Sequence, residues 1–380
     1  MSLVNPRIPG GDLTPRPPSP VSRLVAALLP PVTALLIAAV VGDLLILSFG
    51  QSPAEVFKLL LEGTWGNAYG FGQVVYKATT LTFTGLSVAI GIRAGLFNIG
   101  AEGQLAMGGF CAALAGLWLP AGTPALVAIP ICLAAAALGG ATVASVPGVL
   151  KARFGTSEVI VTIMVNFITL AFLNWLISAK LNVAESLHTP EIQAGAVPRI
   201  SAVVETFRGS AANFVLLVAL AAAGYVGWYL FRTRAGFDLR AVGLQPDAAE
   251  YGGVKVGKVW LQAMLLAGAL AGLGGTNYVL GYKQYYEEGF AGGAGFIGIA
   301  VALVGRNHPV GVVIAAFLFA TLSQGGLAVN AVVPKQMVDI LTAVVIIAVA
   351  TSVPEVQRLL KSGGAAAGAV RGARRRGAER

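Results

Sequence analysis

Residues 124–149 read PALVAIPICLAAAALGGATVASVPGV, a long apolar run that contains no charged side chain. A transmembrane helix needs about 20 consecutive, predominantly apolar residues, so this stretch predicts a helix that crosses a membrane. The whole chain has the same character, because 56% of its 380 residues are hydrophobic and only 11% are charged. Ordinary soluble domains contain roughly 25% charged residues. This composition excludes a conventional soluble enzyme and a disordered chain, since neither could cover its surface with so little charge.

Further apolar segments of comparable length lie on both sides of this run. They are predicted at about 24–49, 75–93, 99–119, 157–179, 212–231, 259–281, 288–305, 309–329 and 335–352. Segments 99–119 and 288–305 are rich in glycine and could be broken or re-entrant. We therefore predict an all-α fold, a polytopic membrane helix bundle of about ten transmembrane helices.

The distribution of basic residues predicts the orientation of this bundle. With both termini in the cytoplasm, the inside segments hold 19 of the 26 basic residues, as the positive-inside rule requires. The other seven are Lys58, Lys77, Lys180, Arg199, Arg208, Lys283 and Lys335. The basic residues behind the net charge of +9 therefore mostly flank membrane helices, where they can contact anionic lipid. They form no basic face for nucleic acid.

The same reading divides the chain into three parts. Residues 1–23 are expected to be a disordered cytoplasmic tail, 24–355 the transmembrane domain, and 356–380 a basic, disordered cytoplasmic tail. Within the membrane domain, residues 180–211 form an external loop and residues 232–258 a cytoplasmic loop. The two histidines lie far apart, so no metal site is predicted.

The cytoplasmic loop has charged and apolar residues at helical spacing between Asp238 and Tyr251. Gly243 permits a turn and Pro246 suits the first turn of a new helix, so two short helices are expected on the membrane surface. They could dock a cytoplasmic protein or be merely a solvated loop. Further along, Lys258 has the spacing of a P-loop lysine, but Val259 replaces the Ser or Thr that would reach Mg²⁺. We infer that this chain binds no ATP.

Buried polar residues mark a second region, GIRAGLFNIGAEGQLAMGGF at 91–110. Asn98, Glu102 and Gln104 lie there at membrane depth, which is tolerable along a wet pathway or where partners are found. Its glycines permit a broken backbone. Two interpretations remain open, a capped turn with an Arg93–Glu102 pair or a gate on a translocation pathway. Asn166, within the next span, suits either interhelical hydrogen bonding or substrate contact.

Four stretches together resemble the permease subunits of ABC importers. They are GLFNIGAEGQ (95–104), TSEVIVTIMVNFI (156–168), LRAVGLQPDAAEYGGV (239–254) and GFIGIAVALVGRNHPVG (295–311). The resemblance covers roughly residues 25–355 and is to the simple-sugar and nucleoside branch of the branched-chain amino acid/ribose-type permeases. The third stretch is similar to the coupling helices that seat in the ATPase. It implies ATPase contacts by Arg240, Ala241, Gly243, Asp247, Ala248, Ala249 and Gly252.

The resemblance also implies partners and a role. The partners are a cytoplasmic ABC ATPase that binds the ATP, a second homologous permease and an extracytoplasmic substrate-binding protein or lipoprotein. The chain would be a transport subunit of a bacterial plasma (inner) membrane, without catalytic residues or a cofactor of its own. The residues of the GLFNIGAEGQ motif favour a nucleoside as substrate. The alternatives are a permease for a simple sugar or an ATPase-independent secondary transporter.

Overall fold

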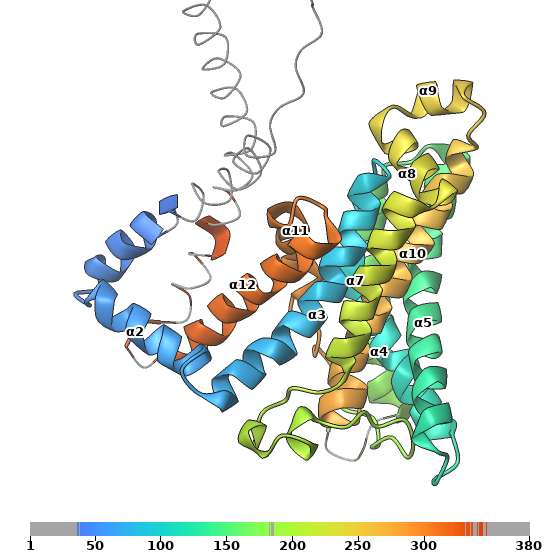
Figure 1. The fold of residues 1–380 in the computed structure, drawn as a ribbon. Coiled ribbons are helices and arrows are strands. Elements are labelled where there is room, and N and C mark those ends of the chain that lie inside the picture. The colour runs from blue at the N-terminus through green and yellow to red at the C-terminus, as the bar shows by residue number, and fades with distance from the viewer. Residues whose placement is uncertain are drawn as a thin grey trace, which may run out of the picture.

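A computed structural model describes residues 36–347, apart from 38, 182, 184–185, 331, 335, 337–339, 341 and 345–346 (Figure 1). Within these residues the regular elements are all helical. The longer helices are α2 (Pro53–Thr64), α3 (Ala68–Arg93), α4 (Ala101–Trp118), α5 (Ala125–Phe154), α6 (Glu158–Leu176), α7 (Val215–Arg232), α8 (Arg234–Leu244), α10 (Val256–Tyr278), α11 (Ala294–Val304) and α12 (Pro309–Ala328). The short elements are α9 (Pro246–Tyr251), the π-helical turns η1 (Ile177–Leu181) and η4 (Val279–Lys283), and the 3₁₀ turns η2 (Ile200–Ala202) and η3 (Glu205–Phe207).

Six of the described helices are long and apolar enough to cross a membrane: α3, α5, α6 with η1, α7, α10 with η4, and α12. A seventh candidate pairs the helix Ala39–Ser48 with α2, but a bend of 112° separates the two. The sequence did not predict α2, whose start is favoured by Pro53 in the first helical turn. The predicted span 335–352 and both terminal tails lie largely or wholly outside the described residues.

Of the two glycine-rich predicted spans, 288–305 is only partly helical. Helix α11 has 11 residues, which at about 1.5 Å each cover roughly half of a hydrocarbon core about 30 Å thick. Gly289, Gly292 and Gly293 precede it in the left-handed region, with φ of 73°, 53° and 82°, and so keep the helix from starting earlier. Segment 288–305 is therefore a half-span, in agreement with the re-entrant alternative. Helix α4, by contrast, covers most of segment 99–119 without a break, and a non-helical stretch at 94–100 precedes it.

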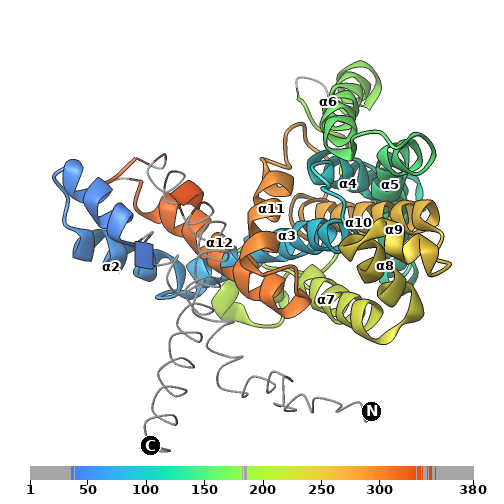
Figure 2. The ribbon, with the colours of Figure 1, turned by 90° about the horizontal axis from the view of Figure 1, so that it is seen from above.

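Helices α4, α5 and α10 pack without side chains between their closest turns. A Cβ added to Gly140 would lie 2.1 Å from the carbonyl oxygen of Gly268, and one added to Gly272 would lie 2.3 Å from that of Ala136. Small residues let membrane helices approach this closely. The resulting van der Waals contacts stabilise the packing, because the hydrophobic effect does not drive helices together in lipid. Gly268 and Gly272 of α10 both make such backbone contacts with α5. Seen from above, α2 and α12 lie to one side of this group (Figure 2).

Candidate functional site

The break between α3 and α4 is held by a cluster of buried amides. Asn98 donates to the Ser87 hydroxyl at 3.2 Å, and Asn98 and Gln104 exchange two amide hydrogen bonds of 2.9 and 3.0 Å. Ser87 lies six residues before the end of α3 at Arg93, which is about 9 Å along the helix axis. The chain therefore turns back into the bundle after Arg93, and α4 begins inside it.

Asn166 ties this break to α6. Its side-chain oxygen accepts from the backbone N–H of Gly103 at 2.9 Å, and its amide donates to the carbonyl of Ile99 at 2.8 Å. Both backbone groups lie where no helical ladder satisfies them. Of the two interpretations of Asn166, the structure favours interhelical hydrogen bonding.

Glu102 joins the start of α4 to the start of α11. Its carboxylate oxygens accept from the backbone N–H groups of Gly293 at 2.8 Å and Gly295 at 2.7 Å, and the residue is 5% exposed. A carboxylate at a helix N-terminus is favoured by the unsatisfied N–H groups and by the helix dipole. The alternative of an Arg93–Glu102 pair is wrong, because Arg93 instead donates to the carbonyl oxygens of Asn307 at 3.0 Å and Arg306 at 3.4 Å.

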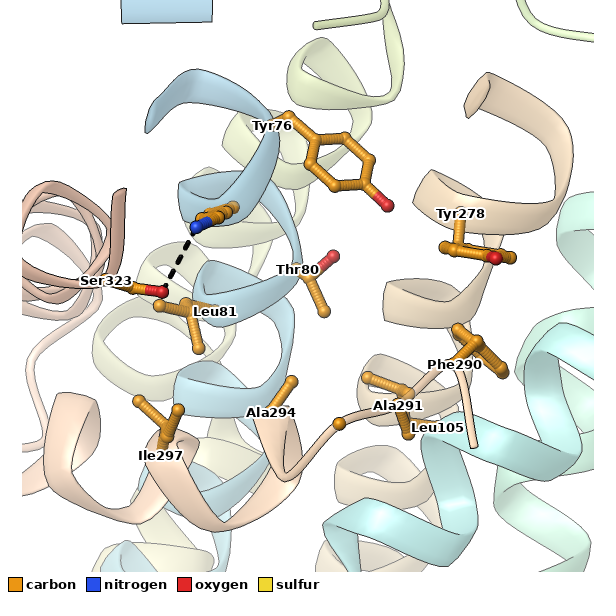
Figure 3. Close-up of a pocket in the computed structure, with 12 residues that line it drawn as sticks. Tyr76, Thr80, Leu81, Leu105, Tyr278, Phe290, Ala291, Ala294, Ile297 and Ser323 are labelled. Carbon is orange, nitrogen blue, oxygen red and sulfur yellow. Dashed lines mark hydrogen bonds between the residues drawn. The ribbon is translucent and has the colours of Figure 1, made fainter. Parts of the chain in front are cut away.

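Next to this junction lies a cavity of about 240 Å³ between α3, α10, α11 and α12 (Figure 3). Aromatic rings form one part of its wall, with Tyr76 from α3, Tyr278 from α10 and Phe290 from the segment before α11. The Tyr278 and Phe290 rings lie 4.9 Å apart, and the Tyr278 hydroxyl donates to the Glu287 carboxylate. Such rings offer flat apolar faces to a planar ligand.

Polar groups line the other part of the cavity. Lys77 donates to the hydroxyl of Ser323 on α12 at 3.2 Å, and the Thr80 hydroxyl accepts from the buried Asn277 amide at 2.8 Å. Ala294 and Ile297 of α11 complete the lining. A small solute with a flat ring and several hydroxyls would find both kinds of partner here.

The structure thus brings all four predicted pathway residues, Asn98, Glu102, Gln104 and Asn166, to one buried junction. None of them lines the cavity, which is formed by their neighbours, including Leu105 and Ala294. Sequence reasoning missed the cavity residues, because tyrosines and threonines inside apolar helices carry no signal for the direction in which they point. The glycines at 289–293, which break the chain beside the cavity, were the nearest available signal.

The loop after α7 forms the two helices α8 and α9, which project from one end of the bundle (Figure 1). The Thr233 hydroxyl caps α8 by accepting from the N–H of Gly236 at 3.0 Å, and Pro246 opens α9. At the tip, Leu244 is 84% exposed and Tyr251 is 97% exposed. Sequence reasoning did not single out these two side chains, although large apolar groups so exposed mark interaction sites.

The seven residues of the proposed ATPase contact face in different directions. Asp247, Ala248 and Gly252 are exposed, Arg240 and Ala241 are half-buried, and Ala249 is buried. Gly243 faces the protein itself, since a Cβ there would lie 2.1 Å from the carbonyl oxygen of Arg93 and 3.0 Å from the backbone nitrogen of Gly95. Helix α8 therefore rests directly on the start of the break between α3 and α4.

Basic groups surround the Phe231 ring at this end of the bundle. The guanidinium carbons of Arg240 and Arg93 lie 5.4 and 6.0 Å from the ring centroid, and the His308 ring stacks on it at 5.4 Å. Burial, together with the charge of Arg93, lowers the pKa of His308 below its usual value. His308 precedes α12 and belongs to the turn after α11, so the ring connects α8, α3 and that turn.

Among the described residues, no group of three or more His, Cys, Asp or Glu side chains is arranged to hold a metal ion. The features present are a bundle of several membrane-crossing helices, a cavity lined by aromatic and polar groups beside a half-helix, and an exposed helical lobe at one end. These define a membrane transport subunit. The chain belongs to the family described as branched-chain amino acid transport system / permease component, whose model matches residues 70–350.

Comparison with curated proteins finds relatives over most of the chain. The guanosine ABC transporter permease protein NupP of Bacillus subtilis is 38% identical, over 87% of this chain and 95% of the relative. The nucleoside ABC transporter permease protein NupB of Lactococcus lactis is 35% identical, over 84% and 90%. The glucose ABC transporter permease protein TsgB13 of Haloferax volcanii is 33% identical, over 85% and 87%. Permeases NupQ and NupC of the first two species also match, at 29% and 27% identity. This chain is thus an ABC permease subunit and not an enzyme.

Proposed function

We propose that this permease carries nucleosides across a bacterial inner membrane as part of an ATP-driven importer. The observation that carries the proposal is the lining of the cavity. Tyr76, Tyr278 and Phe290 offer aromatic faces, and base–aromatic stacking contributes about 1–3 kcal/mol per base. Lys77 and Ser323 offer hydrogen-bonding groups suited to ribose hydroxyls. The relatives NupP and NupB, which are described as guanosine and nucleoside permeases, support the same substrate class.

A simple sugar is the second candidate, and the glucose permease relative favours it. Uptake of labelled guanosine and labelled glucose, measured in cells that carry the complete system and in cells that lack this chain, separates the two. We expect chain-dependent uptake of guanosine that excess adenosine inhibits and excess glucose does not. Chain-dependent uptake of glucose without uptake of guanosine would overturn the nucleoside assignment.

The energy source in this proposal is a separate cytoplasmic ABC ATPase that binds the ATP. Support comes from the α8–α9 lobe, which carries Arg240, Asp247 and Ala248, with Leu244 and Tyr251 at its tip. A secondary transporter would work without that ATPase. Nucleoside uptake that persists after the ATPase is inactivated by a substitution in its own P-loop would contradict the ATP-driven mechanism.

We further propose that the assembly contains a second, homologous permease and an extracytoplasmic binding protein. The pairs NupP with NupQ and NupB with NupC, each found in one species, support a second permease. The topology that accompanies this proposal has about ten spans with both termini in the cytoplasm. It places the α8–α9 lobe inside the cell and the loop that contains η2 and η3 outside.

A further inference from the structure

We propose that half-helix α11 is the movable floor of the cavity, and that Glu102 and Arg93 are positioning residues that clamp its two ends to the 93–102 segment. Through these contacts, a movement of the α8–α9 lobe would move α11 as well. The proposal rests on the proposed function, because it takes the lobe as the place where the ATPase acts.

The first clamp is at the N-terminal end of α11. Glu102 accepts from the N–H groups of Gly293 and Gly295, and a Cβ at Gly295 would lie 2.3 Å from the backbone nitrogen of Glu102. Charge-assisted hydrogen bonds of this kind are about twice as strong as neutral ones. The start of α11 therefore moves only if the start of α4 moves or if these bonds break.

The second clamp is at the opposite end of α11. There the chain turns through Arg306 and Asn307, both in the left-handed region with φ of 55° and 52°. Asparagine tolerates this conformation, but it is unfavourable for Arg306 and persists there only where the surroundings hold it. Arg93 supplies that hold by donating to the carbonyl oxygens of both residues. One short segment, 93–102, thus binds both ends of the same helix.

The clamped segment is rigid and touches the lobe. The Asn98–Gln104 amide pair and the two bonds from Asn166 fix its backbone. Gly243 of α8 packs on the backbone of Arg93 and Gly95. A displacement of α8 is consequently passed to both ends of α11, through contacts between packed elements and not through a flexible linker.

Helix α11 lies where its movement would change access to the cavity. Ala294 and Ile297 line the cavity, and α11 runs from there to the turn after Gly305, which Arg93 binds. The helix therefore separates the cavity from the end of the bundle that carries the lobe. A displacement of α11 would open the cavity toward the end of the bundle that carries the lobe.

The test uses the complete transporter reconstituted in proteoliposomes, with Glu102→Gln, Arg93→Gln and the double variant. Glu62→Gln is the control, because this carboxylate on α2 pairs with Lys58 at 3.9 Å, outside the 93–102 segment. Losing a charged hydrogen bond shifts an equilibrium roughly tenfold to a hundredfold. We expect guanosine uptake by each single variant to decrease by a factor in that range. ATP hydrolysis stimulated by the loaded binding protein should stay near the wild-type rate.

Two residues that clamp one helix should not act independently. We expect uptake by the double variant to be no lower than uptake by the more impaired of the two single variants, because the two losses should not add. Normal uptake per ATP in Glu102→Gln would overturn the clamp, and so would parallel losses of uptake and stimulated hydrolysis in an intact complex. Failure of the wild-type complex to take up guanosine would instead reject the proposed function.

A second measurement follows access to the cavity directly. Ala294→Cys is introduced after Cys111 and Cys132 are replaced by Ser, and a membrane-impermeant thiol reagent is applied from the lobe side. We expect labelling to require ATP turnover in this chain, and to become independent of ATP when Glu102→Gln is added. Equal labelling with and without ATP in the chain that retains Glu102 would show that α11 is a fixed wall.

Discussion

Asn166 illustrates why an amide suits a break in a membrane helix. One side chain donates to the Ile99 carbonyl and accepts from the Gly103 N–H, so it satisfies two backbone groups that no helix pairs. An aliphatic residue of similar size would leave both groups unsatisfied in a dry interior. Leaving a buried group unsatisfied costs about 1–3 kcal/mol.

Replacing Asn166 by Leu should therefore lower the stability of the chain markedly. The expected result is a fall of several degrees in the midpoint of thermal aggregation of the detergent-purified protein. Asn174→Leu, the same change further along α6 at a half-buried position, serves as control and should have a much smaller effect. Equal midpoints for the two variants would show that the Asn166 bonds contribute little.

At the cavity, Tyr278→Leu removes an aromatic ring that lies 4.9 Å from the Phe290 ring. Since base stacking contributes about 1–3 kcal/mol, the concentration of guanosine loaded on the binding protein that gives half-maximal uptake should rise, or the maximal rate should fall, by at least fivefold. Tyr225→Leu is the matched control, on a face of α7 where the side chain is 50% exposed. If both variants behave alike, Tyr278 does not contact the substrate.

At the scale of elements, the lobe and the glycine-packed helices place opposite demands on their side chains. The α8–α9 tip exposes Leu244 and Tyr251, whereas α4, α5 and α10 tolerate nothing larger than hydrogen at their crossing points. The first arrangement favours contact with another molecule, and the second favours contact between backbones. Substitutions in the two places should therefore fail in different ways.

For the lobe, Leu244→Glu should weaken or abolish binding of the ATPase, because a charge replaces an apolar side chain in the proposed contact. The measurement is co-purification of the ATPase with the tagged permease. Leu187→Glu, at a 57% exposed position in the loop at the opposite end, should leave co-purification unchanged. Retention of the ATPase by Leu244→Glu would argue that the tip is not the docking site.

For the packed helices, Gly272→Val should prevent formation of the native bundle, because its Cβ would overlap the backbone of α5 at Ala136. We expect loss of the monodisperse peak in size-exclusion chromatography. Gly224→Val on α7 is the control, since no atom lies within 4 Å of a Cβ there. A monodisperse Gly272→Val protein would mean that α5 and α10 can separate without loss of the fold.

For the whole molecule, the proposed topology is tested by cysteine labelling in intact cells. A cysteine at Ser201 in η2 should react with an impermeant reagent from outside, and cysteines at Ala248 in α9 and at Ser362 only after permeabilisation. Ser362 lies outside the described residues. Reaction of Ser201 and Ser362 positions from the same side would contradict the ten-span arrangement with both termini inside.

Much of the molecule could be predicted from sequence, because its signals are local. Among the described residues, apolar length predicted the six helices that are long and apolar enough to cross a membrane, Pro246 and Gly243 predicted a lobe of two helices, and glycines predicted the breaks. The partner of Glu102 could not be predicted, since Gly293 is 191 residues away and only the packing of α11 on α4 brings them together. The bend before α2 and the direction of Tyr278 depend in the same way on tertiary contacts.

The bare tip of the lobe has a consequence for the life of the protein in the cell. In the proposed assembly, a newly made permease that has not met its ATPase would present Leu244 and Tyr251 to the cytoplasm, and apolar side chains exposed in this way attract chaperones and proteases. Assembly would hide the tip. The abundance of the permease would thereby be coupled to that of its ATPase, because surplus subunits would be removed by turnover.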